Sequence, residues 1–253
     1  MTGAAGSVGR AFCHSPVAAD VELVATDVET LDVTNPSQVG RWTRDVRPDV
    51  VLHLAGAKHA PDGELDPQRV TAVNAVGTIN VVAAANRSGA RVVTASTCKA
   101  CDPETAYGAS KLLAERITLN AGGTVVRYYN IPESDGNVFR LWESLPPDEP
   151  LPVARQAFRY FLSMEVAVAL TRAVLDVPSG RYTVDPGEGE FMWQVAERIY
   201  PGREHVDVPL RRGDRRVEKL CAASEQMTPF GFLTVITSQH DPVWEGRTDD
   251  EGV

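Results

Sequence analysis

The sequence predicts an α/β fold, in which helices cover both faces of a Rossmann-like, doubly wound parallel sheet. The first observation is the glycine-rich string Gly3-Ala-Ala-Gly6-Ser7-Val-Gly9 near the start of the chain. The second is the alternation of short apolar runs with helical patterns over the first 130 residues. Strands that alternate with helices in this way are typical of βαβ units, whose strands run parallel.

The glycine-rich string is expected at the turn between a first strand and a first helix. Glycines there permit a tight bend and let the backbone approach a pyrophosphate at the helix N-terminus. Gly3, Gly6, Ser7 and Gly9 are therefore candidate cofactor-binding residues, and a plain glycine-rich turn is the alternative. Only Met1 and Thr2 precede the string, so we expect the first strand to be truncated.

A second strand is predicted over Val21–Asp27, and it ends in an acidic residue. Asp27 lies 24 residues after Gly3, close to the ~20-residue spacing at which a carboxylate meets the adenosine ribose. No arginine follows directly to hold a 2′-phosphate, which favours NAD over NADP. Asp32 follows shortly and is expected to face the adenine. The alternative for Asp27 is a solvated acid at a strand end.

The middle of the chain continues the alternation. Residues 48–56 form a nearly continuous apolar run, as in a buried parallel strand. Residues 66–87 have helical periodicity. A strand over 90–95, a helix over 107–120 and a strand over 124–127 follow.

The pattern becomes irregular from about residue 131, where prolines cluster at 146, 147, 150 and 152. An amphipathic helix is predicted over Met164–Leu175. We expect residues 1–130 to bind NAD and residues 131–253 to bind mainly substrate, with some elements returning to the sheet. The aromatic side chains of Phe139, Trp142 and Trp193 are most simply core. Arg247–Val253 is polar and acidic, as in a disordered tail.

Composition excludes several other classes of protein. Hydrophobic residues make up 43% and charged residues 23%, as in a globular chain, and the net charge of −9 argues against nucleic-acid binding. There is no apolar run of about 18 residues and no signal peptide, so no membrane association is expected. Four scattered cysteines and no histidine spacing typical of metal ligands indicate a reducing cytoplasm and no metal site.

Candidate catalytic residues follow the strand over 90–95. Thr97, Cys98 and Lys99 lie at its end, and Tyr107 and Lys111 lie on one face of the next helix. The lysine ammonium can lower the pKa of the tyrosine and hold a nicotinamide ribose. The phenolate can then take a proton from an alcohol as hydride leaves for NAD.

Several strings resemble the extended short-chain dehydrogenases/reductases, and within them the UDP-N-acetylglucosamine 4,6-dehydratases of bacterial polysaccharide pathways. The resemblance runs from Gly3 to about Leu220, although residues 31–49 are more similar to a 4-ketosugar reductase. The strings that carry it are His53–Pro61, Asn74–Val81, Ser96–Pro103 with Tyr107–Lys111, Arg127–Asn130, Arg159–Phe161 and Arg212–Leu220.

The resemblance implies an NAD-dependent dehydratase that acts on a UDP-N-acetylhexosamine. It places Ala55, Gly56 and Asn74 near the cofactor. It places Lys58 and His59 near the sugar, where a solvated basic turn is the alternative, and it places Asn130, Arg159 and Arg212 at the diphosphate or uridine. The lysine that matches Lys99 is the base at C5 of the sugar. A homodimer or higher homo-oligomer, commonly formed through the helix that carries Tyr107, is also implied.

Cys98 departs from the family pattern, in which an aspartate at this position is the acid for the C6 hydroxyl. A free thiol has a pKa near 8.5, against about 3.9 for aspartate. An unperturbed thiol can still donate a proton, whereas a neighbouring Lys99 cation would favour thiolate. The product is therefore left open among a 4-keto-6-deoxy sugar, its C5 epimer and a 5,6-ene. Cys98 can also be an inert small residue. A 4-epimerase or 4-ketoreductase, and a dinucleotide sensor or scaffold without activity, are the rival hypotheses.

Overall fold

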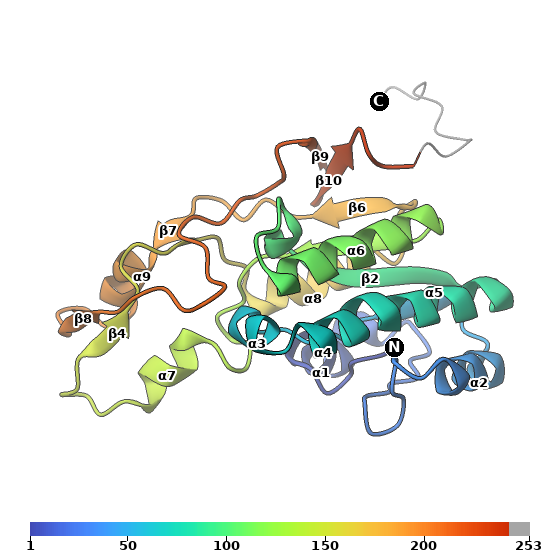
Figure 1. Cartoon of the computed structure of the whole chain (residues 1–253), viewed down its shortest axis with the longest axis horizontal. Helices are drawn as coiled ribbons and strands as arrows, with labels where there is room; N and C mark the ends of the chain where they lie inside the picture. Colours follow the sequence, from blue (N-terminus) through green and yellow to red (C-terminus); the bar gives the residue numbers. More distant parts are fainter. Residues whose placement is uncertain (243–253) are drawn as a thin grey trace.

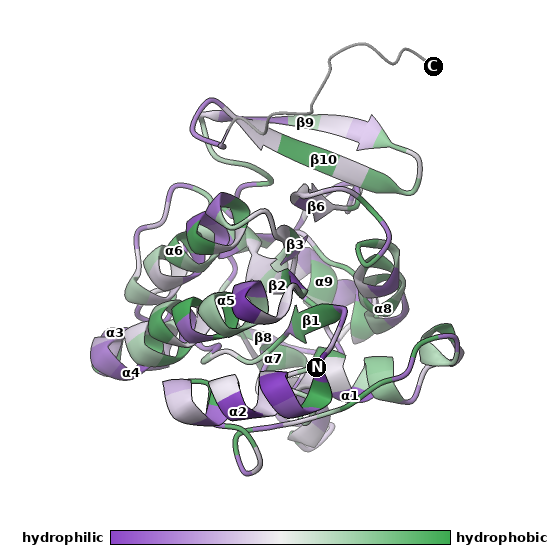
Figure 2. Ribbon diagram, turned by 90° about the vertical axis from the view of Figure 1, so that its right-hand side faces the viewer, coloured by the Kyte–Doolittle hydropathy of each residue, from purple (hydrophilic) through white to green (hydrophobic). Residues whose placement is uncertain are grey.

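A six-stranded sheet forms the centre of the molecule in the computed structural model, which describes residues 1–242. The strand order is β1-β2-β3-β6-β10-β9. The first four run parallel, and β10 and β9 form an antiparallel hairpin beside β6 (Figure 2). Their bounds are β1 Val50–His53, β2 Arg91–Thr97, β3 Thr124–Tyr128, β6 Gly180–Thr183, β9 Glu225–Phe230 and β10 Leu233–Ser238. The predicted disordered tail, Arg247–Val253, lies outside the described residues.

The first two strands of the expected pattern are reduced to short contacts. Thr2 forms parallel bridges with both Thr26 and His53, so it lies within the sheet plane beside β1. Of the strand predicted over Val21–Asp27, only Thr26 forms a β-bridge. The physical reason is the short partner: Met1–Ala4 bonds to this segment through Ala4 N to Thr26 O, Thr26 N to Met1 O and the Met1 amino group to Val24 O.

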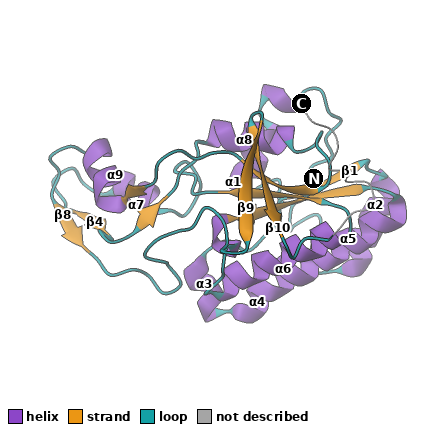
Figure 3. Cartoon of the chain, turned by 90° about the horizontal axis from the view of Figure 1, so that it is seen from above, coloured by secondary structure: helices purple, strands orange, loops and turns teal. Residues whose placement is uncertain are grey.

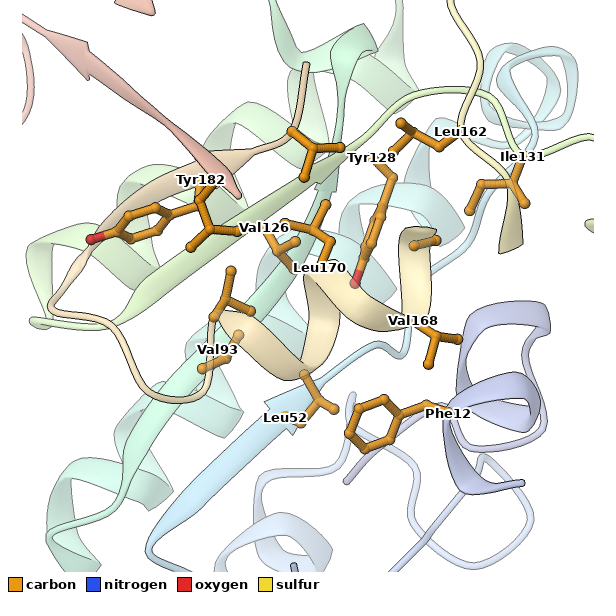
Figure 4. Close-up of a cluster of buried hydrophobic side chains, with 14 of the residues drawn as sticks. Phe12, Leu52, Val93, Val126, Tyr128, Ile131, Leu162, Val168, Leu170 and Tyr182 are labelled. Atoms are coloured by element: carbon orange, nitrogen blue, oxygen red, sulfur yellow. The ribbon is translucent and has the colours of Figure 1, made fainter. Parts of the chain in front are cut away.

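Helices cover both faces of the sheet (Figure 3). One face packs against α2 (Pro36–Val46), α5 (Gly77–Ser88) and α6 (Ala106–Asn120). The opposite face packs against α1 (Ser7–Cys13) and α8 (Met164–Ala173). Figure 4 shows the hydrophobic core on this opposite face, in which Phe12 and Leu170 pack with β-strand residues such as Val93 and Val126. The helix expected over 164–175 thus forms with nearly the predicted bounds.

Capping residues explain where the main helices begin and end. The Asn35 side chain accepts hydrogen bonds from the backbone of Ser37 and Gln38, and Pro36 occupies the first helical position of α2. Thr105 caps α6, and Gly89, with φ of 75°, ends α5.

The helical pattern predicted over 66–87 folds as three connected pieces. They are α4 (Pro67–Thr71), a π-helical turn (Ala72–Val76) and α5. Further short helices are the 3-10 turn Pro16–Ala18, α3 (Ala60–Leu65) after β1 and the 3-10 turn Cys98–Ala100 after β2. The last two follow the carboxyl ends of parallel strands, where ligand sites of such sheets lie.

A small lobe extends from the carboxyl ends of the strands (left in Figure 1). Its elements are α7 (Val138–Ser144), β4 (Leu151–Val153), β5 (Phe158–Arg159), β7 (Glu190–Phe191), α9 (Met192–Ile199) and β8 (His205–Asp207). It has its own core, in which Trp142 is 1% exposed. The prediction that Trp193 is core is wrong, because this side chain is 38% exposed and lies beside the Arg155 guanidinium. Chain after residue 131 also supplies α8, β6, β9 and β10 to the main body.

None of the helices within residues 1–242 is long and apolar enough to cross a bilayer.

Candidate active site

A cavity of about 400 Å³ lies between the carboxyl ends of β1, β2 and β3 and the small lobe. It is formed by segments that are far apart in the sequence: the glycine-rich turn, the loop after β1, the end of β2 with the turn that follows it, the start of α6, the loop after β3 and the small lobe. Most of the predicted site residues line it, namely Gly3, Gly6, Ser7, Gly9, Gly56, Lys58, His59, Thr97, Lys99, Tyr107, Lys111, Asn130 and Arg159.

The glycine-rich turn is packed too closely for side chains at two positions. A Cβ on Gly3, whose φ is 73°, would lie 2.5 Å from the backbone nitrogen of Ala55, and one on Gly9 would lie 2.3 Å from the Gly3 oxygen. The turn therefore lies directly against the end of β1. The Asp27 carboxylate accepts a hydrogen bond of 2.7 Å from Ala5 N. An acidic group thus borders a bare backbone turn at the cavity, which fits an adenosine ribose and a pyrophosphate.

Four predicted cofactor residues do not line the cavity, and Asp27, which borders the glycine-rich turn, is one of them. Asp32 accepts hydrogen bonds from the backbone and hydroxyl of Thr34, so its carboxylate stabilises a local turn rather than reaching the cavity. Asn74 is buried and bonds to both backbone groups of Ala57 and to Ser110 Oγ. It therefore fixes the loop after β1 against α6. Ala55 contributes its backbone to the same loop.

Tyr107 and Lys111 lie one helical turn apart in α6, and both line the cavity. Burial lowers the pKa of Lys111 to about 8. Burial raises the pKa of Tyr107 above 10, and the positive charge of Lys99 and a hydrogen bond with Thr97 oppose that rise. Our prediction that Lys111 lowers the tyrosine pKa is therefore not what the structure shows: Lys99 is the cation that opposes the rise, and the net shift is upward.

Lys99 reaches the cavity from the 3-10 turn after β2 and is paired with a buried carboxylate. Its Nζ lies 2.7 Å from Glu218 Oε1 and 3.2 Å from Asn130 Oδ1. Asn130 Nδ2 donates to Glu218 Oε2 at 2.6 Å, and Arg159 Nε lies 3.5 Å from Oε1. Burial alone would lower the pKa of Lys99, but the Glu218 carboxylate raises it well above its ordinary value. Lys99 is therefore an ammonium at neutral pH.

Cys98 is 1% exposed and does not line the cavity. Its Sγ lies 3.5 Å from Glu218 Oε2, as donor to the carboxylate. Burial and the negative charge of Glu218 raise the pKa of the thiol to about 12, against the weaker opposing effect of Lys99. The expectation that Lys99 would favour a thiolate is wrong, because the Glu218 charge and the apolar surroundings outweigh the lysine.

A polar clasp, defined here as Ser7, Arg10, Lys58 and Asp135, joins the glycine-rich turn to the loop after β3. Lys58 Nζ donates to Ser7 Oγ at 3.3 Å and to the Asp135 backbone oxygen at 3.0 Å. The Asp135 carboxylate accepts from Ser7 Oγ at 3.0 Å and pairs with Arg10. Lys58 and His59 both line the cavity.

Arg212 is the predicted substrate residue that the structure places elsewhere. It is exposed and does not line the cavity, because the loop around Gly213 lies against Ala60. Sequence reasoning missed Glu218 and Asp135 as site residues. The only signal for Glu218 was its position within a string that resembles the family, and for Asp135 there was none. Within residues 1–242, no three His, Cys, Asp or Glu side chains gather as a metal site would require.

The sheet, the glycine-rich turn and the Tyr107–Lys111 pair define a protein of the extended short-chain dehydrogenase/reductase type. Residues 18–239 match the family described as "Polysaccharide biosynthesis protein". The match covers most of the chain, and the chain therefore belongs to this family.

A curated relative agrees with this assignment, and solved structures share the fold. The chain is 25% identical over 215 residues to the UDP-N-acetylglucosamine 4,6-dehydratase (inverting) of Campylobacter jejuni, a match that covers 79% of this chain and 64% of that protein. This chain thus matches less than two thirds of that relative's length. The crystal structure of Pen from Bacillus thuringiensis superposes with a TM-score of 0.83 and 22% identity, over 94% of this chain and 88% of that chain. The structure of the Thermus thermophilus UDP-glucose 4-epimerase in complex with NAD superposes with a TM-score of 0.73 and 23% identity. The match covers 87% of this chain and 88% of that chain.

Proposed function

We propose that this protein is an NAD-dependent sugar-nucleotide dehydratase that acts on a UDP-N-acetylhexosamine. One observation carries the proposal: Lys99, paired with Glu218, lines the same cavity as Tyr107 and Lys111. Tyr107 and Lys111 are sufficient for oxidation and reduction at C4. A further lysine next to them is what removal of a C5 proton requires. The family and the dehydratase relative support the same conclusion.

Residues that line or border the cavity suit three parts of NAD, namely the pyrophosphate and the two riboses. Gly3, Gly6, Ser7 and Gly9 would hold the pyrophosphate, Asp27 the adenosine ribose and Lys111 the nicotinamide ribose. When bound, the cofactor supplies a hydride acceptor at C4 that returns the hydride later, so it is regenerated.

The protein residues handle the protons. Tyr107 takes the proton of the C4 hydroxyl, and the positive charge of Lys99 stabilises the phenolate. The C4 ketone makes the C5 hydrogen acidic, and Lys99 removes it. The C6 hydroxyl then leaves as water and a 5,6-ene forms. Return of the hydride to C6 with a proton to C5 would give a 4-keto-6-deoxy sugar or its C5 epimer, whereas return of the hydride to C4 would release the 5,6-ene.

Substrate contacts come from the remaining cavity residues. Asn130 and Arg159 would hold the diphosphate, since a guanidinium suits phosphate oxygens, and Lys58 and His59 would contact the sugar. Arg212, outside the cavity lining, has no part in this proposal.

Mass spectrometry of UDP-N-acetylglucosamine incubated with the protein and NAD in deuterated water tests the function. We expect loss of the mass of one water. Deuterium at C5 would indicate a 4-keto-6-deoxy product, and an alkene without deuterium would indicate the 5,6-ene. Lys99→Ala should abolish water loss while NAD still binds; retained elimination would remove Lys99 from the mechanism.

A 4-epimerase or 4-ketoreductase is the second candidate, because such an enzyme needs only Tyr107, Lys111 and the cofactor. The fold shared with the Thermus thermophilus 4-epimerase supports it. The same incubation distinguishes the two, since an epimerase leaves the substrate mass unchanged.

The proposed assembly is a homodimer formed through α5 and α6. These helices pack side by side, and Leu113 on α6 and Ile79 on α5 are 52% and 48% exposed. Sedimentation velocity should show a dimer, and Leu113→Glu should convert it to a monomer. An unchanged dimer in that variant would locate the interface elsewhere.

A further inference from the structure

Elimination of water from a sugar needs a base for the C5 proton and an acid for the C6 oxygen. Lys99 lines the cavity, but the side chain at the neighbouring acid position, Cys98, does not. The thiol is turned toward Glu218 and is enclosed in the apolar core. The cavity therefore has one proton-carrying group at this position. Because Lys99 is an ammonium paired with Glu218, it can take the C5 proton only after its own proton has moved to a neighbouring group.

Glu218 is the buried group in contact with that lysine. Its side chain is 2% exposed, whereas that of Lys99 is 24% exposed, so the lysine lies between the carboxylate and the cavity. The two Glu218 oxygens contact Lys99 and Arg159 on one side and Asn130 and Cys98 on the other. One carboxylate thus joins segments from β2, β3, β5 and the loop before β9.

We propose that Glu218 is a proton-storing positioning residue behind Lys99, which allows this one lysine to serve as both base and acid in the elimination. The inference rests on the proposed function. It assigns to Glu218 a role that acts through Lys99, without contact between Glu218 and the sugar.

The proton balance closes over one cycle. Lys99 begins as an ammonium and Glu218 as a carboxylate. As the C5–H bond breaks, Lys99 passes one proton to Glu218 and takes up the C5 proton, so that the pair holds one proton more than at rest. As the C6–O bond breaks, Lys99 gives a proton to the departing oxygen, water forms, and Glu218 returns its proton to Lys99.

The surroundings allow this exchange because they hold both positive and negative charge. The charged or titratable groups that face the pair are Cys98 on the same turn, Tyr107 on α6 and Arg159 on β5. Arg159 remains beside Glu218 at every stage and favours return of the proton to Lys99. Burial raises the pKa of Glu218, but the charges of Lys99 and Arg159 lower it, and the net shift is below the ordinary value. Glu218 is therefore an unprotonated carboxylate at neutral pH before the reaction begins.

The first experiment observes Lys99 directly. The chain has only four lysines, at 58, 99, 111 and 219, so the side-chain signals of ¹⁵N,¹³C-lysine-labelled protein can be assigned with Lys99→Arg. In the wild type, Lys99 should stay an ammonium across the accessible alkaline range. In Glu218→Gln its titration midpoint should fall by at least one pH unit, because burial is no longer opposed. Two results would overturn the proposal: a Lys99 titration midpoint in the wild type that is the ordinary one for lysine, or a midpoint in Glu218→Gln that is unchanged from the wild type.

The second experiment is the pH dependence of water loss. Glu218→Gln cannot store a proton, so an ammonium at Lys99 has no acceptor. Turnover at pH near 6.5 should fall by about 100-fold, the scale of a lost acid–base group, and should recover as the pH rises through the Lys99 midpoint. Glu218→Asp, which keeps the carboxylate, should retain most of the flat wild-type profile. Exposed Glu165 supplies the matched control, Glu165→Gln, with no change expected.

The outcomes separate this inference from the proposed function. A wild type that releases no water from any UDP-hexosamine would refute the function, and the inference with it. A wild type that eliminates water, together with a Glu218→Gln loss that is equal at all pH values, would refute only the proton store. If Glu218→Gln does not fold, the wild-type titration and the Glu218→Asp profile decide.

Discussion

The molecule contains two buried ion clusters, and they differ in whether one of their side chains reaches the cavity. The cavity cluster is Lys99, Glu218 and Arg159. The sheet cluster is Glu115, Arg127, Arg181 and Glu225, whose side chains are at most 2% exposed. Arg127 bonds to Glu115 at 2.7 Å and to Glu225 at 2.6 Å, and Arg181 bonds to Glu115 at 2.9 Å.

The difference teaches what each cluster can do. The cations of the sheet cluster are arginines, which do not lose a proton in proteins, and its members come from α6, β3, β6 and β9. It therefore fixes how these elements pack. The cavity cluster has a lysine at its open end, and a lysine can release and regain a proton. Under the proposed function, similar ion pairing serves structure in one place and chemistry in the other.

Arg127→Met should have the largest effect, because it removes the guanidinium that pairs with both Glu115 and Glu225 and leaves Arg181 to balance the two buried carboxylates. Breaking a buried pair in this way costs about 3–5 kcal/mol. Urea unfolding followed by circular dichroism measures the loss. A change below about 1 kcal/mol would show that the sheet cluster is not the structural element that we infer.

Lys99→Met should cost less stability, on the order of 1–3 kcal/mol, because Glu218 keeps Asn130 and Arg159 as partners. Its pH dependence is informative. In the wild type the pKa of Glu218 is below its ordinary 4.5, so the stability from this carboxylate is present above pH 4.5 and is lost as the pH falls through the folded-state pKa.

Without Lys99, burial is less opposed and that pKa rises, so the loss should begin at a higher pH in the variant. Melting temperatures between pH 3 and 7 measure it, with Lys219→Met as a control at an exposed pair. Parallel curves for Lys99→Met and the wild type would contradict the assigned coupling.

Cys98→Ala tests which residue of the 3-10 turn carries protons. Removal of one small buried group should cost about 1 kcal/mol, and water loss should stay within a few-fold of the wild type because the thiol does not line the cavity. A decrease of about 100-fold, typical of a lost general acid, would restore Cys98 as the acid that the family pattern suggested.

An ion pair at the surface should give the smallest effect on stability, and it serves as a reference for the two buried clusters. Arg140 and Glu143 lie 2.8 Å apart with both side chains more than half exposed. A double-mutant cycle with alanine should give a coupling energy below 1 kcal/mol, because solvent screens exposed pairs. A larger value would show that distance, rather than burial, determines the coupling in this protein.

The sequence was most informative where local pattern determines structure. The elements between residues 48 and 128, the glycines of the turn and the Tyr107–Lys111 pair depend on spacing along a few turns or strands. The strand over Val21–Asp27 failed because strand formation also needs a partner of matching length. The thiol of Cys98 was misjudged because its proton depends on Glu218, which lies 120 residues away in the chain. No local pattern contains that contact.

The position of Glu218 in the chain also bears on biosynthesis. The ribosome delivers β1, β2, β3 and β6 by residue 183, so the parallel part of the sheet can form while the rest of the chain is still being made. Lys99 nevertheless lacks its carboxylate until residue 218 has emerged. During translation, the cavity therefore gains the Lys99–Glu218 pair only after the parallel strands around it have been made.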